Sequence, residues 1–366
     1  MASILTNLPA LDLPSGPPVA EPLPADRPVR WGILATGAIA RSFARNLLVL
    51  PDAEVAAVAS RRTESARQFA DLVAGEARTA GREHPRPRAY GSYEQLVADP
   101  DVDVVYVATP HALHKENVQL AFEAGKPVLC EKALTLNARD ARELVAQARS
   151  RGLFFMEAMW MRCHPVVRRI QQLARDGVLG EVQQVRADLG FLVDRPDTDR
   201  LLAPELGGGA LLDMGIYPLT FAWLFLGEPD RVAAAATMSP AGIDLNVSVS
   251  LGYASGAVAS LSSTMTAWSP RTASVATDRG RLDLPEAFHH PSSARWVADG
   301  EVEEITPAHA GPVLGTGLAN EAAEVIRCLR TGQLESPLVP LDETVALMGL
   351  MDTIRERIGL VYDADH

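Results

Sequence analysis

Cysteine is scarce in this sequence. Its 366 residues include only three cysteines, Cys130, Cys163 and Cys328, and they lie far apart. An odd number of widely separated thiols provides neither a disulfide framework nor a Cys-x-x-Cys metal site, and it is typical of proteins in a reducing compartment. We therefore expect a cytoplasmic protein.

Long hydrophobic runs and an excess of basic residues are also missing. The longest nearly apolar run is Pro218–Gly227, which is much shorter than the ~20 residues needed to span a bilayer. Lys and Arg number 34 against 46 Asp and Glu, which leaves a net charge of −12. Because an acidic surface repels phosphate groups, we expect neither nucleic acid nor a membrane as a partner.

The chain is long enough for about two domains, and its pattern changes twice. Residues 1–28 contain seven prolines, which excludes a helix or a central strand and predicts either a disordered tail or an arm that binds a neighbouring subunit. In residues 29–156, short apolar runs alternate with helical segments, which predicts a Rossmann domain with a doubly wound parallel sheet. Its expected strands are Trp31–Ala35, Val55–Ser60, a run near Ala89, Val102–Ala108, Val128–Cys130 and Leu153–Met156, and its helices include Thr63–Ala74, His114–Ala124 and Asn137–Arg151.

Residues 157–366 predict a second, α+β domain for substrate binding and oligomerisation, whose last helices are free to return to the first domain. Consecutive strands joined by turns imply a large, mostly antiparallel sheet. Apolar residues alternate with small ones in two of its strands, which predicts a flat face that another copy of the chain, or the chain's own helices and first residues, must cover. The expected strands are Val182–Leu192, Val232–Met238, Leu245–Tyr253, Ala257–Met265, Thr272–Thr277 and Arg281–Leu284, with helices at Ala210–Phe225 and Leu318–Arg330.

The turn after the first strand has the position of a dinucleotide-binding fingerprint. It reads Ala35-Thr36-Gly37-Ala38-Ile39-Ala40, so only the middle glycine of Gly-x-Gly-x-x-Gly is present. That glycine lets the backbone approach a pyrophosphate, and the next helix offers its N–H groups. We expect Thr36, Gly37, Ala38 and Ile39 to bind a dinucleotide, with a plain strand-to-helix turn as the alternative.

The second strand ends in Ser60-Arg61-Arg62, without the Asp or Glu that holds the ribose 2′-hydroxyl of NAD. Guanidinium groups and a serine hydroxyl suit a 2′-phosphate instead. We therefore expect NADP(H), with NAD(H) less favoured, although a pair of solvated arginines would give the same pattern.

Polar residues also follow the fourth and fifth strands. Thr109, Pro110, His111 and His114 come after the fourth strand, and Glu131-Lys132 closes the fifth. Ligands bind beyond the carboxyl ends of the strands in open α/β sheets, so we expect these residues to flank the cofactor and the substrate. His111 and His114 lack a third ligand at matching spacing, so we expect no metal.

Two polar residues lie in an otherwise apolar helical segment. Asp213 and Tyr217 are four residues apart and share one face of the predicted helix. Asp213 follows three glycines and alternatively serves as the N-terminal cap of that helix. His289 and His290 lie in a polar loop, where we expect no role for them.

Several blocks, taken in order, resemble the glucose-fructose oxidoreductase/inositol dehydrogenase (Gfo/Idh/MocA) family. Within it, the blocks are most similar to the dimeric dihydrodiol dehydrogenases, also described as D-xylose 1-dehydrogenases. The resemblance implies an oxidoreductase that pairs its large sheets into a homodimer or homotetramer. The blocks are Trp31-Gly32-Ile33, Ala89–Glu94, Val128–Lys132, Phe155–Trp160, Gly207–Tyr217 and Glu335-Ser336-Pro337.

The resemblance also implies roles for individual residues. Lys132 falls on the family's lysine, which hydrogen-bonds the reacting oxygen, and Tyr217 falls on its proton carrier. A phenol titrates near ~10, so we expect the Lys132 cation to lower the pKa of Tyr217. Asp213 would orient substrate hydroxyls, and Trp160 and Arg162 would line the nicotinamide end.

Taken together, the sequence predicts an NADP-dependent oxidoreductase. Hydride would pass between nicotinamide and a hydroxyl or carbonyl carbon of a cyclic polyol, a sugar or a trans-dihydrodiol. Two alternatives are a sugar-nucleotide 3-ketoreductase of deoxysugar synthesis and a non-catalytic, NADP-sensing regulatory protein. Ala133 stands where the family has proline, so a cis peptide bond is not assumed at this position.

Overall fold

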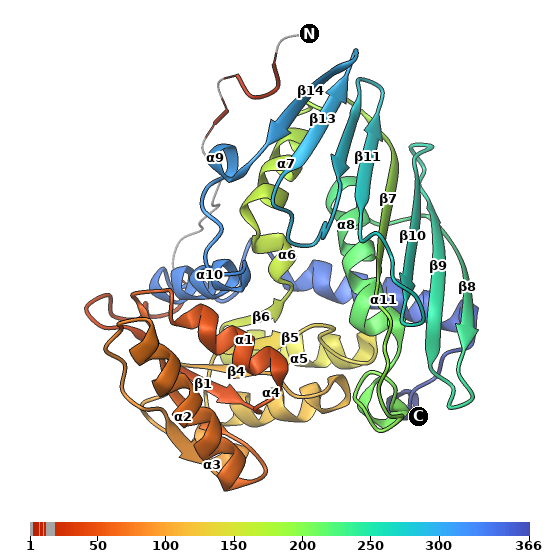
Figure 1. The fold of residues 1–366 in the computed structure, drawn as a ribbon. Helices are drawn as coiled ribbons and strands as arrows, with labels where there is room; N and C mark the ends of the chain where they lie inside the picture. Colours follow the sequence, from red (N-terminus) through yellow and green to blue (C-terminus); the bar gives the residue numbers. More distant parts are fainter. Residues whose placement is uncertain (1–2, 7, 10, 12–18) are drawn as a thin grey trace.

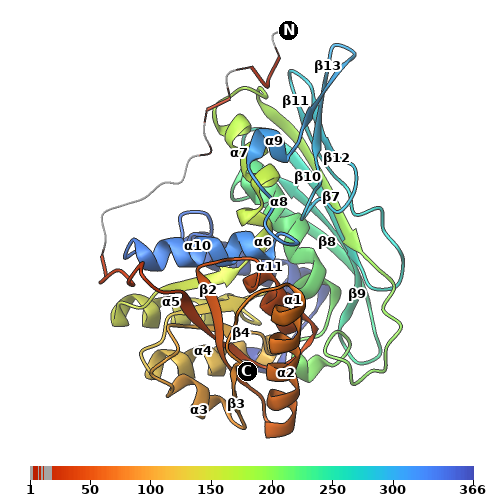
Figure 2. The same cartoon turned by 60° about the vertical axis from the view of Figure 1, so that its left-hand side comes forward.

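The fold contains two sheets that lie side by side, as the computed structural model in Figures 1 and 2 shows for residues 3–6, 8–9, 11 and 19–366. The first sheet has six parallel strands in the order β3-β2-β1-β4-β5-β6. Its central strands are buried on both faces because helices cover each side. The elements of this domain are β1 (Val29–Leu34), α1 (Ala38–Leu47), β2 (Ala53–Ala59), α2 (Thr63–Thr79), β3 (Arg88–Tyr90), α3 (Tyr93–Val97), β4 (Val104–Val107), η1 (His111–Leu113), α4 (His114–Glu123), β5 (Val128–Glu131), α5 (Ala138–Arg151) and β6 (Phe155–Ala158).

The second sheet has eight strands in the order β14-β13-β12-β11-β7-β10-β9-β8. Neighbouring strands are antiparallel except for β7 and β10, which pair in parallel because α8 and two further strands separate them in the chain. The elements after β6 are α6 (Trp160–Cys163), α7 (Pro165–Arg175), β7 (Val182–Gly190), η2 (Pro204–Leu206), η3 (Leu211–Gly215), α8 (Ile216–Leu226), β8 (Arg231–Met238), β9 (Asp244–Gly252), β10 (Val258–Thr264), β11 (Ala273–Thr277), β12 (Arg281–Leu284), β13 (Ala294–Ala298), β14 (Glu301–Ile305), α9 (Pro307–Ala310), α10 (Leu318–Arg330), α11 (Leu341–Ile358) and η4 (Asp363–Asp365).

These two sheets confirm the predicted fold class. The sequence analysis did not identify β13, β14, α7 and α11, and it placed the sixth strand two residues early. The buried residues of helix α11 recur at spacings of three and four, but Thr344 and Arg355 are polar and Val345 is apolar yet only half-buried, which blurs the apolar stripe in the sequence. Helix α10 packs against α1, and α11 packs against α5, so both late helices touch the first domain.

One face of the second sheet is covered by the chain itself, and the other is open (Figures 1 and 2). Val247, Val249 and Leu251 are buried on the covered face, beneath α8 and its neighbours, whereas Ser248 and Ser250 are exposed. The small residues of these strands therefore form the open face, because alternation directs the large apolar residues to the covered face. The open face is lined mainly by small and polar side chains.

The described residues of the N-terminal segment lie along their own chain. The Ser3 hydroxyl bonds the Glu303 carboxylate, and the Arg169 guanidinium donates to the Pro9 carbonyl oxygen at 2.8 Å. Farther on, the Val19 N–H donates to the Gly332 carbonyl oxygen at 2.8 Å. Figures 1 and 2 show this segment on the side of the molecule away from the open sheet face, so it does not cover that face.

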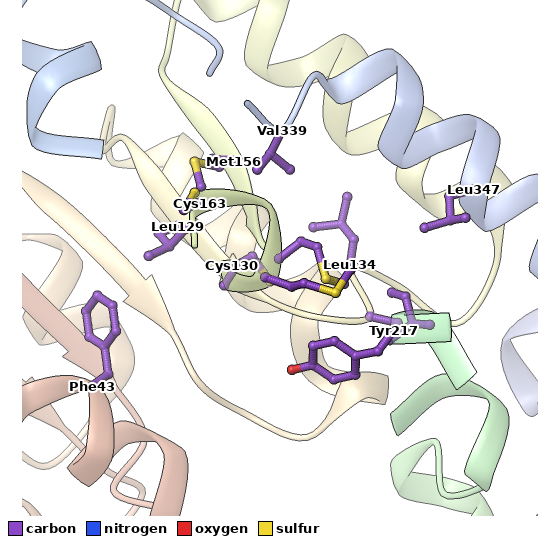
Figure 3. Packing of buried hydrophobic residues seen from close by; sticks show 14 of the residues in the cluster. Phe43, Leu129, Cys130, Leu134, Met156, Cys163, Tyr217, Val339 and Leu347 are labelled. Carbon is purple, nitrogen blue, oxygen red and sulfur yellow. The ribbon is translucent and has the colours of Figure 1, made fainter. Parts of the chain in front are cut away.

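The segment Pro204–Leu226 is apolar and long enough to cross a membrane by length and composition alone. Its most apolar window is 78% buried inside the fold, with α8 packed against β7 and β10. A helix buried in this way serves as the core of the second domain. Figure 3 shows Tyr217 of this helix in the packed cluster that also contains Leu134, Cys130 and Cys163.

Candidate active site

Lys132 follows β5 directly, at the carboxyl edge of the parallel sheet, and its side chain is 12% exposed. Its ammonium donates to the backbone oxygen of Asp213 at 2.7 Å and to Oδ1 of Asp213 at 3.3 Å. The same nitrogen lies 5.0 Å from the centre of the Tyr217 ring. The structure therefore brings together the three residues expected to be catalytic, although Lys132 is 81 residues from Asp213 in the chain. The peptide bond from Lys132 to Ala133 is cis despite the absence of proline.

Asp213 lies in η3, a single turn of π-helix that precedes α8. The approach to this turn requires glycine at position 209, because its φ is +128° and a Cβ there would lie 2.2 Å from Oδ1 of Asp244. Asp244 also accepts the Leu211 N–H at 2.6 Å, so it fills the capping role considered for Asp213. The Asp213 carboxylate does not cap the helix, so it is available to contact other groups of the candidate active site. π-Turns of this kind are frequent at functional sites.

Two cations share the Asp213 carboxylate. Besides Lys132, the Arg200 guanidinium donates to Oδ1 of Asp213 at 3.0 Å. Although burial favours the neutral acid, the charges of Lys132 and Arg200 hold the pKa of Asp213 well below its usual range. Arg200 lies in the loop before the three glycines and is 46% exposed, so it borders the mouth of the site. The sequence analysis did not single it out, because a lone arginine in a polar loop carries no spacing signal.

Tyr217 is nearly buried, and its hydroxyl has one defined partner. The indole N–H of Trp160 donates to the Tyr217 oxygen at 2.7 Å. Burial and the charge of Glu131 raise the pKa of Tyr217 well above its ordinary value, whereas the Trp160 hydrogen bond acts in the opposite direction. The expectation that Lys132 lowers this pKa is wrong for the cofactor-free protein, because desolvation of the phenolate outweighs the nearby cation.

The two histidines after β4 hold the backbone of the site. Nδ1 of His111 lies 2.9 Å from the Gly207 oxygen, and its Nε2 lies 3.2 Å from the Lys132 oxygen. Nε2 of His114 lies 2.9 Å from the Thr109 oxygen, and its Nδ1 lies 3.0 Å from the Ala133 oxygen. Burial lowers the pKa of His111 to about 3 and that of His114 to about 4. A neutral ring carries a single N–H, so each histidine donates to only one of the two carbonyl oxygens beside it. No group of His, Cys, Asp or Glu in the described part of the chain is arranged to hold a metal ion.

The loop between β12 and β13 contributes two histidines, His289 and His290, for which the sequence predicts no role. The His289 ring lies 5.0 Å from the Tyr217 ring, and the His290 ring stacks on Trp160 at 5.2 Å with an interplanar angle of 20°. Nδ1 of His289 is buried and has no partner within the described residues. The two histidines therefore form one wall of the Tyr217 site, which corrects that expectation. Trp160 was found from its motif, but its bond to Tyr217 crosses 57 residues.

The turn after β1 has the features expected for a pyrophosphate site. Gly37 precedes α1 with no side-chain cap, and a Cβ at this position would meet nothing within 4 Å. The residues around the turn, Thr36, Ala38 and Ile39, are exposed or half-buried. The first N–H groups of a helix have no partner within the helix, so they are free to bind phosphate oxygens. Ala35 replaces the first glycine of the fingerprint and adopts a φ of +84°, so the turn keeps its left-handed residue without glycine.

The end of β2 fits a 2′-phosphate. Arg61 and Arg62 are exposed, Ser60 is half-buried, and neither arginine has an acidic partner within the described residues. Two unpaired guanidinium groups beside a hydroxyl are the donors that a phosphate dianion prefers. The residues at this strand end therefore suit NADP(H) better than NAD(H).

The remaining predicted cofactor residues have different surroundings. The Tyr106 hydroxyl donates to Glu131, and burial raises the pKa of this glutamic acid. Thr109 and Glu131 are buried, and Pro110 is half-buried. Arg162 turns toward α11, where it donates to Glu343 at 2.6 Å and to the Leu338 oxygen at 2.7 Å. The Arg162 guanidinium therefore contacts α11 and the residues just before it, whereas the neighbouring Trp160 contacts Tyr217.

Comparisons with known proteins identify the family of this chain. Residues 29–159 match the description "Oxidoreductase family, NAD-binding Rossmann fold", and residues 167–283 match the GFO/IDH/MocA C-terminal domain. The chain is 38% identical to a bovine (Bos taurus) trans-1,2-dihydrobenzene-1,2-diol dehydrogenase over 346 residues, covering 92% of this chain and 99% of the relative. It is 36% identical to the human (Homo sapiens) protein of the same name, with the same coverage.

Solved structures are similar as well. A 3-ketoreductase from Actinomadura kijaniata in complex with NADP and TDP-benzene is 28% identical, with a TM-score of 0.76 over 91% of this chain and 98% of that one. An aldose-aldose oxidoreductase from Caulobacter crescentus is 24% identical with a TM-score of 0.78, over 90% of this chain and 97% of that one. At that identity, the second similarity shows the fold alone.

Proposed function

This chain belongs to the GFO/IDH/MocA family of oxidoreductases, and from that premise we propose that it is an NADP-dependent dehydrogenase of sugars, cyclic polyols or trans-dihydrodiols. The observation that carries the proposal is the convergence of Lys132, Asp213 and Tyr217 at the carboxyl edge of the parallel sheet. Arg61 and Arg62 would hold the 2′-phosphate, and the turn at Gly37 the pyrophosphate. When bound, NADPH supplies a hydride from C4 of its nicotinamide.

The chain's own residues manage the charge and the proton. In carbonyl reduction, the Lys132 ammonium stabilises the oxygen that gains negative charge, and Tyr217 donates its proton to that oxygen. The Tyr217 oxygen already accepts a hydrogen bond from Trp160, so its own O–H is free to point at a substrate. A raised pKa keeps this phenol protonated, as reduction requires. Oxidation of the alcohol reverses both transfers, and Asp213 holds Lys132 in place throughout.

The test is an activity panel with matched variants. The purified protein is mixed with NADPH or NADP⁺ and with aldoses, inositols, dihydrodiols, dicarbonyls and nucleotide-linked ketosugars, and absorbance at 340 nm is followed. Lys132→Ala and Tyr217→Phe should keep NADPH binding but lose about 10²–10⁴-fold in turnover. Full activity of Tyr217→Phe would show that another group carries the proton. NADPH binding without turnover on any substrate would favour the sensing protein.

A sugar-nucleotide 3-ketoreductase is the second candidate. It is supported by the similarity to the Actinomadura kijaniata enzyme at 28% identity. The 36–38% identity to dihydrodiol dehydrogenases favours the first candidate. A preference of at least about tenfold in kcat/KM for a nucleotide-linked ketosugar over the free sugar would reverse this order.

We also propose that the protein is a cytoplasmic homodimer, or a dimer of dimers, formed through the open face of the second sheet. The support for the assembly is that this face carries small side chains, among them Ser248, Ser250 and Ser260, so that two such sheets can approach closely. A stable interface should bury over ~2,000 Å². Light scattering at low micromolar concentration tests this: the mass of one chain would refute the dimer. All three cysteines are free and buried, which suits a reducing cytoplasm.

A further inference from the structure

One buried acid near the candidate site has no partner. Glu321 lies on α10, is fully buried, and neither of its carboxylate oxygens has a hydrogen-bond partner within the described residues. An isolated carboxylate is costly to bury, so such a group is either neutral or matched to a charge that arrives from outside. Its neighbour on the next turn, Glu324, is also buried but is paired with Arg327 at 2.8 Å.

Glu321 lies near the candidate site, because its charge acts on Tyr217. Gly317, the N-cap residue of α10, lies four residues before Glu321 and packs so closely against Trp160 that a Cβ there would lie 3.0 Å from its ring. Trp160 in turn bonds Tyr217. Helix α10 packs on α6 and α1. The unpartnered carboxyl therefore lies behind the aromatic wall of the site, next to the edge where the nicotinamide end of a dinucleotide belongs.

The titratable groups around Glu321 are acids, phenols and a thiol. They are Tyr106 on β4, Glu131 at the end of β5, Cys163 on α6 and Tyr217 on α8, each of which interacts electrostatically with Glu321. Burial and the charge of Glu131 raise the pKa of Glu321 well above its usual value. Because an unpaired carboxylate is costly at this buried position, the cofactor-free protein favours the neutral acid.

We propose that Glu321 is the counter-charge of the oxidised nicotinamide ring, neutral without cofactor and ionised when NADP⁺ binds. This inference rests on the proposed function. The oxidised ring carries a positive charge that favours the carboxylate, whereas the reduced ring is neutral and leaves the acid protonated. NADP⁺ binding therefore releases more protons to solvent than NADPH binding does, and the affinity for NADP⁺ rises with pH.

The experiment compares three ligands on the full chain. Binding of NADP⁺, NADPH and 2′-phospho-ADP-ribose, which lacks nicotinamide, is measured by calorimetry for the wild type, Glu321→Gln and Glu324→Gln. Glu321→Gln should weaken NADP⁺ by up to about tenfold at pH values where Glu321 is already ionised, the effect of one charge within ~12 Å at an effective dielectric constant of ~20. The loss should be smaller at lower pH, because part of this energy is then used to ionise the acid. The variant should leave NADPH and 2′-phospho-ADP-ribose unchanged. Glu324→Gln should change none of the affinity ratios, because Arg327 already neutralises Glu324.

A second measurement needs no variant. Calorimetry of the wild type in two buffers with different ionisation enthalpies should show that NADP⁺ releases up to about half a proton more than NADPH does, since both cofactors share the same 2′-phosphate. Equal proton release with the two cofactors overturns the proposal even if Glu321→Gln does not fold, and so does an equal effect of that variant on NADP⁺ and NADPH. If 2′-phospho-ADP-ribose and both cofactors fail to bind the wild type, the proposed cofactor site itself is wrong.

Discussion

The hydrogen bond from Trp160 to Tyr217 allows a quantitative test of how the site handles its proton. Trp160→Phe removes the indole N–H, which lies 2.7 Å from the Tyr217 oxygen, and keeps a ring that stacks on His290. A hydrogen bond to a neutral phenol contributes ~0.5–1.5 kcal/mol, and one to a phenolate ~1.5–3 kcal/mol. The variant therefore loses about 1 kcal/mol more in the phenolate form, which raises the pKa of Tyr217 further.

The consequence differs between the two directions of the reaction. Oxidation of the alcohol passes through the phenolate, so we expect the rate at fixed pH to fall about fivefold more than the rate of carbonyl reduction. The assay is the pH dependence of kcat in both directions, with the substrate that the panel identifies. In a Tyr217→Phe background, Trp160→Phe should have no further effect, and Trp268→Phe, at a residue that is 75% exposed, serves as the neutral control. Equal losses in both directions, or a loss that persists without the phenol, would refute the reasoning.

Three further predictions concern charge. Replacing Arg61 and Arg62 by Ala should weaken NADPH by ~1.5–3 kcal/mol and leave NADH nearly unchanged, as cofactor titrations would show; equal losses would contradict the NADP assignment. Asp213→Asn leaves two cations without their shared carboxylate and should lower the free energy of unfolding by about 3 kcal/mol in urea titrations, and adding Arg200→Gln should restore part of it. Two arginines hold the pKa of Asp103, whose side chain is 7% exposed, at about 2 against an ordinary 3.8, so its contribution of about 2 kcal/mol is present above pH 3.8 and lost as the pH falls through 2. Asp103→Asn should therefore destabilise at pH 7 but not at pH 2.

Local sequence determined the first domain and the positions of the candidate catalytic groups along the chain. The apolar runs of β1, β4 and β5 are buried on both faces, and such strands alternating with helices have few alternatives to a parallel sheet. Lys132 follows β5, and the residues after parallel strands meet at one edge of the sheet. Its place at the carboxyl edge of the sheet therefore needed no knowledge of distant residues. The missing acid at Ser60-Arg61-Arg62 is likewise a local signal.

The contacts that tune the site were decided by the tertiary structure. Trp160 and Tyr217 meet across 57 residues, and Arg200 reaches Asp213 from a loop with no regular pattern. His289 comes from a polar loop between two strands, one of which the sequence analysis did not identify. No period or spacing encodes such pairs, because they depend on how α8, the second sheet and the loops pack together. The direction of the Tyr217 pKa was misjudged for the same reason: a nearby cation was visible in the motif, but the burial that opposes it exists only once the domains close around the phenol.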